Sequence, residues 1–121
     1  MSLFENNAAQ ALRKGLDAAW IRQQVSSHNI ANSETPGFKA KTVRFEEVMK
    51  KAKEGTGETG AEYKAVIGED QTTAVRPDGN NVSTEKEEMD LWEAYYQYSA
   101  MTKRMAANLS SLRYVINNTG K

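Results

Sequence analysis

The sequence predicts a mainly α-helical chain, in which two long terminal helices pair as a coiled-coil-like bundle and are joined by a small middle insert of a short helix and a β-hairpin. Two observations predict this. At both ends, apolar residues recur about every 3.5 residues, the period of helices that pack along one another. Both prolines and six of the eight glycines lie between residues 36 and 79. We therefore divide the 121 residues into a helical segment 1–35, a joint and insert 36–83, and a helical segment 84–121.

The apolar stripe of the first segment is thin. Its members follow one another at spacings of three and four residues: Ala9, Leu12, Leu16, Ala19, Gln23, Ser26 and Ile30. Alanine, glutamine and serine occupy positions where leucine would stabilise a helix pair better, and isolated helices near this length are marginal in water. We expect this helix to depend on a partner helix.

The stretch SSHNIANSETPGFKAK, residues 26–41, ends that helix. The residue before a proline is disfavoured in helical geometry, so the Thr-Pro-Gly sequence at 35–37 predicts an exit. His28, Asn29 and Asn32 near this exit fit either an active site or an assembly joint. The chain has no cysteine, the neighbouring serines lack an acidic residue to orient a base, and catalytic triads normally draw on separate elements. We interpret His28 as structural and the two asparagines as caps of terminal helix carbonyls.

The middle segment predicts small elements. Phe45, Val48, Met49 and Ala52 lie at i, i+3, i+4 and i+7, which indicates a short amphipathic helix. The glycine-rich residues 54–60 indicate a loop. Residues 61–67 and 72–76, separated by Gly-Glu-Asp-Gln, indicate a hairpin. The Pro-Asp-Gly sequence within residues 76–81 indicates a turn.

The last segment carries the stronger stripe, again at spacings of three and four residues: Leu91, Tyr95, Tyr98, Thr102, Met105, Leu109, Leu112 and Ile116. Thr84 and Glu87 form the pattern of a capping box, which predicts the helix start. Acidic residues crowd the first turns and basic residues come late, which matches the helix dipole.

Composition excludes several functions. The chain carries 16 basic and 16 acidic residues, so it has no positive excess for a nucleic-acid backbone. Without cysteine it has no disulfide or thiolate metal site, and no phosphate-binding glycine motif occurs. We expect no enzyme activity, no cofactor, no metal and no small-molecule substrate. The first residues show no basic region followed by an apolar one, so we also expect no cleaved signal peptide.

The aromatic group Trp92, Tyr95, Tyr96 and Tyr98 fits either a platform for nucleic-acid bases or a helix face that packs on a partner. Basic residues are not interleaved with it, as they are in base-stacking sites, so we favour packing. A helix pair would still leave partly apolar outer faces. The hydrophobic fraction is only 39%, and we expect oligomerisation to complete the burial. The predicted subunit-contact residues on the helices are Leu12, Leu16, Ala19, Ile30, Leu91, Tyr95, Tyr98, Met105, Leu109, Leu112 and Ile116.

The stretch at 26–41 resembles the Asn-Ile-Ala-Asn-x-x-Thr-Pro-Gly-Tyr/Phe-Lys segment shared by rod and hook proteins of the bacterial flagellum, with Phe38 where tyrosine is more usual. The segment from Asp78 to Met101 resembles the proximal-rod branch of that family, the type lettered B. The C-terminal residues from Asn108 to Tyr114 resemble the family's terminal helix. Only residues 50–72 are left without a match.

This resemblance implies a non-enzymatic structural subunit of the flagellar basal-body rod. It implies type III export across the inner membrane without signal cleavage, and self-assembly in which paired terminal helices form an inner tube. The implied partners are other rod subunits and the membrane-ring and export-gate proteins of the basal body. The joint would brace neighbouring subunits, which adds these residues to the expected contacts: Asn29, Asn32, Thr35, Pro36, Gly37 and Phe38.

One alternative stays open. A small helical adaptor, or a chaperone-like binding module of a secretion apparatus, would also carry two amphipathic helices. Such a module would keep stable terminal helices as a dilute monomer, whereas a rod subunit would hold them loosely until it assembles.

Overall fold

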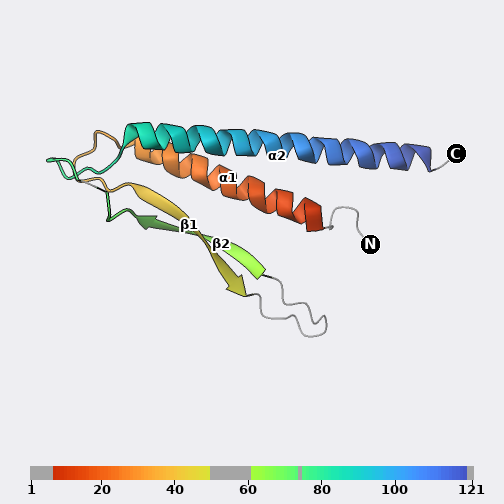
Figure 1. Ribbon diagram of the computed structural model, residues 1–121, viewed down its shortest axis with the longest axis horizontal. Helices are drawn as coiled ribbons and strands as arrows, with labels where there is room; N and C mark the ends of the chain where they lie inside the picture. Colours follow the sequence, from red (N-terminus) through yellow and green to blue (C-terminus); the bar gives the residue numbers. More distant parts are fainter. Residues whose placement is uncertain (1–6, 50–60, 74, 120–121) are drawn as a thin grey trace.

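The computed structural model describes residues 7–49, 61–73 and 75–119. Its elements are α1 (Asn7–Ala31), β1 (Lys41–Met49), β2 (Ala61–Glu69) and α2 (Thr84–Asn118). Figure 1 shows α1 and α2 side by side and antiparallel, and a two-stranded hairpin that leaves the same end of the helix pair and follows α1. The mainly helical class, the paired terminal helices and the middle hairpin are thus confirmed. In the part of the chain that is described, no helix combines the length and the apolar character needed to span a membrane.

Small residues bring the two helices together. Ala19 of α1 and Ala94 of α2 are each only 1% exposed. A Cβ atom built on Gly15 would lie 2.5 Å from the Sδ atom of Met101, so this glycine permits a close approach. The ring centroids of Trp20 and Tyr98 are 6.3 Å apart. The pair is therefore held by close backbone contact rather than by a large apolar core.

The line of contact on α2 differs from the expected stripe. Ala94, not Tyr95, lies against α1, and the side-chain amide of Gln23 donates to the Ala94 carbonyl oxygen at 3.4 Å. Tyr95 is 51% exposed. A tyrosine ring in the place of Ala94 would hold the two backbones apart, so the small residue takes the contact position.

Both helices begin or end near the expected positions. α1 ends at Ala31 and is followed by turns at 32–37, so the exit precedes the proline as predicted. The N-cap of α2 is Ser83, whose hydroxyl accepts from the Lys86 backbone N–H at 3.5 Å. The predicted cap at Thr84 is therefore wrong by one residue, because Ser83 already holds the extended geometry that a cap needs.

The predicted short helix in the insert is wrong. Residues 41–49 form β1, which pairs antiparallel with β2 and sets Phe45 opposite Ala65. The expected strand at 61–67 is confirmed as part of β2, but its partner is β1 and not residues 72–76. Ala52 and the predicted loop at 54–60 lie outside the described residues.

Packing on α1 explains why β1 is a strand. Phe45 lines a pocket together with Ala18 and Ile21 of α1, and the Arg22 guanidinium lies 4.9 Å from the centre of its ring. A strand can present Phe45 to α1 while its backbone bonds β2, and such tertiary contacts override a local helical pattern.

We predict that Ala19→Leu lowers the free energy of unfolding by about 1–3 kcal/mol, because a larger side chain overpacks the contact between α1 and α2. Denaturant unfolding followed by circular dichroism measures this. Ala11→Leu, at an exposed position of the same helix, is the matched control and should stay within about 0.5 kcal/mol of the native chain. Equal losses in the two variants would show that Ala19 does not set the helix spacing.

Candidate functional site

The buried polar side chains gather at one end of the helix pair. They come from the last turns of α1, the chain before α2 and the first turn of α2: Ser26, Asn29, Asn80, Asn81 and Glu87. Asn29 and Asn80 are 0% exposed. Among the described residues, every buried side-chain nitrogen and oxygen has a hydrogen-bond partner. We call this region, residues 26–41 together with 76–87, the joint.

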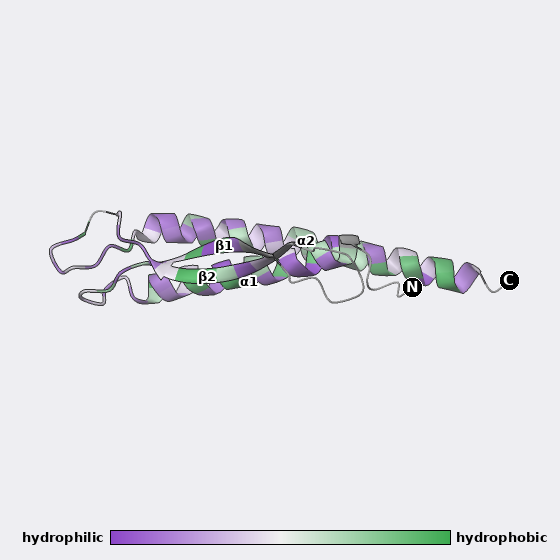
Figure 2. Cartoon of the chain, turned by 90° about the horizontal axis from the view of Figure 1, so that it is seen from below, coloured by the Kyte–Doolittle hydropathy of each residue, from purple (hydrophilic) through white to green (hydrophobic). Residues whose placement is uncertain are grey.

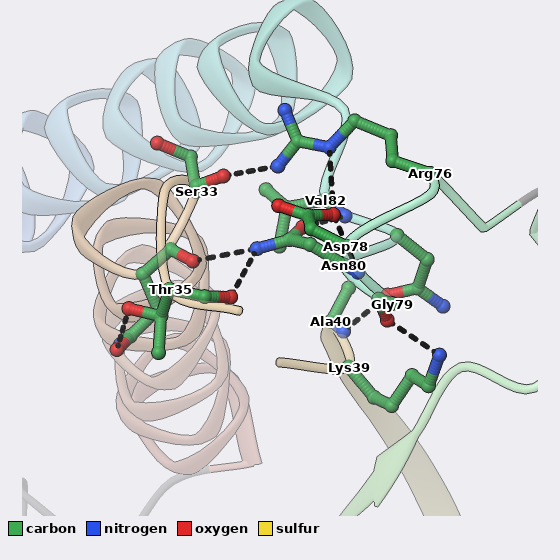
Figure 3. Close-up of polar contacts among 11 residues, drawn as sticks. Ser33, Thr35, Lys39, Ala40, Arg76, Asp78, Gly79, Asn80 and Val82 are labelled. Atoms are coloured by element: carbon green, nitrogen blue, oxygen red, sulfur yellow. Dashed lines mark hydrogen bonds and ion pairs between the residues drawn. The ribbon is translucent and has the colours of Figure 1, made fainter. Parts of the chain in front are cut away.

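Asn80 ties the exit of α1 to the chain that enters α2. Its side-chain Nδ2 donates to the carbonyl oxygens of Asn32 and Thr35, each at 2.9 Å (Figure 3). Its Oδ1 accepts from the Val82 backbone N–H at 2.7 Å. Carbonyls beyond a helix end have no helical donor, and here a residue far along the chain supplies one. One buried amide thus satisfies groups on both sides of the joint.

Asn29 and Asn81 attach the base of the hairpin to the helices. The Asn29 side chain both accepts from the Lys41 backbone N–H and donates to the Lys41 carbonyl, at 2.8 Å in each case. Asn81 accepts from the Ala40 N–H at 2.6 Å and donates to the Asp70 carbonyl at 2.7 Å. These amides bond the backbone of the first residue of β1 and of the residues that flank the two strands, Ala40 and Asp70, and so orient the hairpin.

Two glycines lie in contact at the corner. Gly37 has φ +74° and Gly79 has φ +87°, both in the left-handed region that favours glycine. A Cβ atom on Gly79 would lie 3.2 Å from the Gly37 Cα atom. The Gly37 N–H donates to the Asp78 carbonyl at 2.9 Å, and the Gly79 N–H donates to the Arg76 carbonyl at 2.9 Å. The predicted Pro-Asp-Gly turn is therefore confirmed.

Cationic side chains close the outer side of the joint. The Arg76 guanidinium donates to the Ser33 carbonyl, and its Nε lies 3.9 Å from an Asp78 carboxylate oxygen (Figure 3). The Lys39 ammonium donates to the Gly79 carbonyl at 2.6 Å. Each cation thus binds a backbone carbonyl on a different segment, which adds to the connections made by the asparagines.

Glu87 is the buried ionisable group of the joint. Burial against the end of α1 raises the pKa of its carboxyl group above the ordinary value, while hydrogen bonds from Asn29 and Ser26 act in the opposite direction. Its neighbour Lys86 pairs with Asp90 on the same helix at 2.8 Å. The hydrogen bond from this ammonium to Asp90 raises the pKa of Lys86.

The predicted residues of the joint fall into two groups. Asn32 caps the helix as expected, since its side chain donates to the His28 carbonyl at 2.8 Å. Asn29 does not cap a carbonyl of α1 and binds Lys41 instead. Phe38 is half-buried with its ring 5.6 Å from His28, whereas the Thr-Pro-Gly residues at 35–37 are exposed. The amides of the joint bind backbone groups, an arrangement that holds segments in place.

The opposite end of the helix pair is open and apolar. A groove of about 970 Å³ lies between the two helices there. Its lining combines side chains of α1 and α2: Ala9, Leu12, Arg13, Leu16, Asp17, Trp20, Tyr98, Met105, Asn108, Leu109, Ser111, Leu112 and Val115. Five of the predicted contact residues on α1 and α2 besides Tyr98 lie in it, namely Leu12, Leu16, Met105, Leu109 and Leu112. We call this the terminal groove.

The other predicted helix residues lie outside the terminal groove. Ala19 is buried between the helices, and Ile30 and Leu91 are half-buried near the joint. Tyr95 and Ile116 are exposed. Asn80 and Asn81 belong to the segment that resembles the proximal-rod branch, but the sequence predicted no structural role for them. The available signal was their position, directly between a tight turn and a helix cap, where an asparagine side chain readily bonds backbone groups.

Comparison with known proteins gives a consistent result. Residues 6–39, which span α1 and the first half of the joint, match a family model described as "Flagella basal body rod protein". The flagellar basal body rod protein FlgB of Bacillus subtilis (strain 168) is 32% identical, over 96% of this chain and 97% of the relative. FlgB of Borrelia hermsii is 28% identical over 96% of this chain and 99% of its own length.

We predict that Asn80→Asp lowers the free energy of unfolding by about 2–4 kcal/mol, because a carboxylate is placed at a fully buried position and the carbonyls of Asn32 and Thr35 then face an acceptor in place of the amide donor. Urea unfolding of dilute protein measures the loss. Asn108→Asp, the same change at an exposed position of α2, is the control and should cost about 0.5 kcal/mol or less. A similar loss in both variants would contradict the role given to Asn80.

We predict that Glu87→Gln becomes more stable relative to the native chain as the pH rises from about 4 to about 7. The pKa of Glu87 is raised in the folded state, so its stabilising contribution is present below the ordinary pKa and is lost as the pH rises through the raised one. Glutamine stays neutral throughout. Unfolding curves at several pH values test this, with exposed Glu88→Gln as the control. A difference that is independent of pH would be the contrary result.

Proposed function

The chain belongs to the flagellar basal body rod proteins, and from this premise we propose how it acts. In this proposal it is a structural subunit that polymerises through its terminal helices into the proximal part of the rod. Its full-length similarity to proteins named FlgB supports this branch of the family. In this proposal the subunit acts without catalysis or a cofactor. It lies in the basal body, and it crosses the inner membrane by type III export without losing a signal peptide.

The terminal groove is the observation that carries the proposal. In a single chain the groove leaves apolar side chains of both helices in contact with water, and Leu109 is 49% exposed. Further along α2, Val115 and Ile116 are 54% and 61% exposed. Burying a large apolar side chain contributes about 1.5–3 kcal/mol. Helices of neighbouring subunits that cover these positions would therefore stabilise an assembly.

The joint supports the same proposal in a different way. Its buried amides fix the angle at which the hairpin leaves the helix pair, within one chain. Subunits that must stack regularly need such a fixed angle, because small errors accumulate along a polymer. Residues 35–37 are exposed and Phe38 is half-buried, and we propose that these four residues contact neighbouring subunits. Asn29 and Asn32 position these residues from within.

We propose that the partners are other rod subunits, together with membrane-ring and export-gate proteins of the basal body. The adaptor alternative makes a different prediction, namely a monomer whose helices are equally stable at every concentration. Helicity measured by circular dichroism over a wide range of concentrations separates the two. A rod subunit gains helicity as it associates, because its terminal groove becomes covered.

We predict that Leu109→Asp abolishes swimming when it replaces the native chain in a deletion strain, because it places an unpaired charge in the contact between subunits. In the dilute monomer the same change should lower the free energy of unfolding by about 1 kcal/mol or less, since the position is half-exposed there. Soft-agar motility and urea unfolding measure the two effects.

The matched control is Ser110→Asp, which introduces the same residue one position along the helix, outside the groove lining. Swimming should be retained in this variant. Normal swimming by Leu109→Asp, with normal protein levels, would remove the terminal helices from the proposed contact.

A further inference from the structure

We propose that copies of this chain stack head to tail, with an aromatic ridge at the start of α2 of one copy seated in the terminal groove of the next. The inference rests on the proposed function, because it names the surfaces through which a self-assembling subunit would meet its own kind. It commits to a second copy of this chain as the occupant of the groove. Two features of α2 support the inference: the aromatic ridge, and the separation of acidic residues at the start of the helix from basic residues in its later turns.

The ridge is a preformed aromatic cluster that faces solvent. It consists of Met89, Trp92, Tyr95 and Tyr96, which are 51–73% exposed. The Trp92 ring centroid lies 6.0 Å from those of Tyr95 and Tyr96, and the two tyrosine rings are 6.1 Å apart. These rings contact one another, and α1 is contacted instead by Ala94 and Tyr98. Tyrosine and tryptophan exposed in this way are typical of surfaces that a partner buries.

Acidic residues accompany the ridge. Glu88 and Glu85 precede Trp92 by four and seven residues, spacings that place side chains on one face of a helix. Both are exposed. Lys86, the only basic residue from position 83 to position 93, pairs with Asp90. The ridge therefore carries a net negative charge beside its rings.

The terminal groove has the opposite charge at its edges. Residues 94–118 of α2 contain no acidic residue, whereas Arg104 and Arg113 are exposed one residue from groove-lining positions. Arg13 of α1 lines the groove itself, and Asp17 is the acidic residue among its lining. In the described part of the chain, none of these three guanidinium groups forms an ion pair. They are available to carboxylates of another molecule.

The ridge and the groove lie one after the other along α2: the ridge ends at Tyr96, nearer the joint, and the groove runs from Tyr98 to Val115, toward the other end of the helix pair. In Figure 1 the start of α2 is beside the joint and its end is at the far side, where the groove opens between the helices. Figure 2 shows the same polarity as colour, since α2 begins mostly hydrophilic and carries hydrophobic bands in its last turns. A contact between two different surfaces is heterologous, so it leaves one ridge and one groove free and extends without closing.

The size of the ridge indicates a weak single contact. An aromatic side chain buries about 150–250 Å², so three that are a half to two-thirds exposed can bury about 350 Å² more. A standard stable interface uses roughly 800 Å² on each partner. Association should therefore need high protein concentration in solution, and it should weaken as salt screens the charges at the rim.

The experiment uses two full-length variants, each with one damaged surface. The ridge variant carries Trp92→Ala and Tyr96→Ala, and the groove variant carries Leu109→Asp. Analytical ultracentrifugation of the native chain at rising concentration should show a series of growing oligomers. Each variant alone should stay monomeric. Their equimolar mixture should form a one-to-one dimer and nothing larger, because only one intact ridge can meet one intact groove.

A charge exchange gives the second test. Glu88→Arg, or the pair Arg104→Glu and Arg113→Glu, should weaken association about tenfold or more, and the chain that carries all three changes should regain it. Lys64→Glu and Tyr63→Ala, at exposed positions of β2, are matched controls and should associate like the native chain.

The outcomes separate this inference from the proposed function. Oligomers that form in the native chain but show no dimer in the mixture, or no recovery on charge exchange, overturn head-to-tail stacking. A closed symmetric dimer would give that result, and the rod function would stand if the deletion strain does not swim. A deletion strain that swims normally removes the proposed function itself. A native chain that stays monomeric at millimolar concentration also overturns the stacking.

Discussion

The geometry of this chain depends on the buried amide of Asn80, which bonds the carbonyls at the exit of α1 and the backbone N–H just before α2. Asn80 is 0% exposed, and a buried side-chain amide without partners costs about 1–3 kcal/mol, so this amide favours the arrangement in which both segments meet at this point. The antiparallel helix pair follows from that meeting. Asn29 and Asn81 extend the same constraint to the hairpin, and the glycines at 37 and 79 provide the space for it.

The two ends of the helix pair differ in how completely their side chains are buried and hydrogen-bonded. At the joint, each buried side-chain nitrogen and oxygen of the described residues has a hydrogen-bond partner within the chain. At the far end, the terminal groove leaves apolar side chains of both helices open to water. Between them, the helices approach through Gly15, Ala19 and Ala94, which bury little apolar area. A molecule built in this way has a defined corner as a single chain, and the assembly that we propose would bury the apolar side chains that the groove leaves open.

The charge pattern of α2 is consistent with that division. Acidic residues at the start of the helix and basic residues in its later turns match the helix dipole and need no external partner. The same arrangement gives the molecule an acidic end and a basic end. In the stacking that we propose, this polarity would place the acidic end of one copy against the basic end of the next.

The sequence by itself determined the two long helices, the exit before Pro36, the turn at 77–79 and the capping role of Asn32. Each of these depends on spacing or on backbone preferences within a few residues. Tertiary structure alone decided the rest. Phe45, Val48 and Met49 have helical spacing, yet β1 is a strand because Phe45 packs on α1 and its backbone pairs with β2. Asn80 could not be assigned a role from its neighbours, since the carbonyls that it bonds lie 45 and 48 residues earlier in the chain.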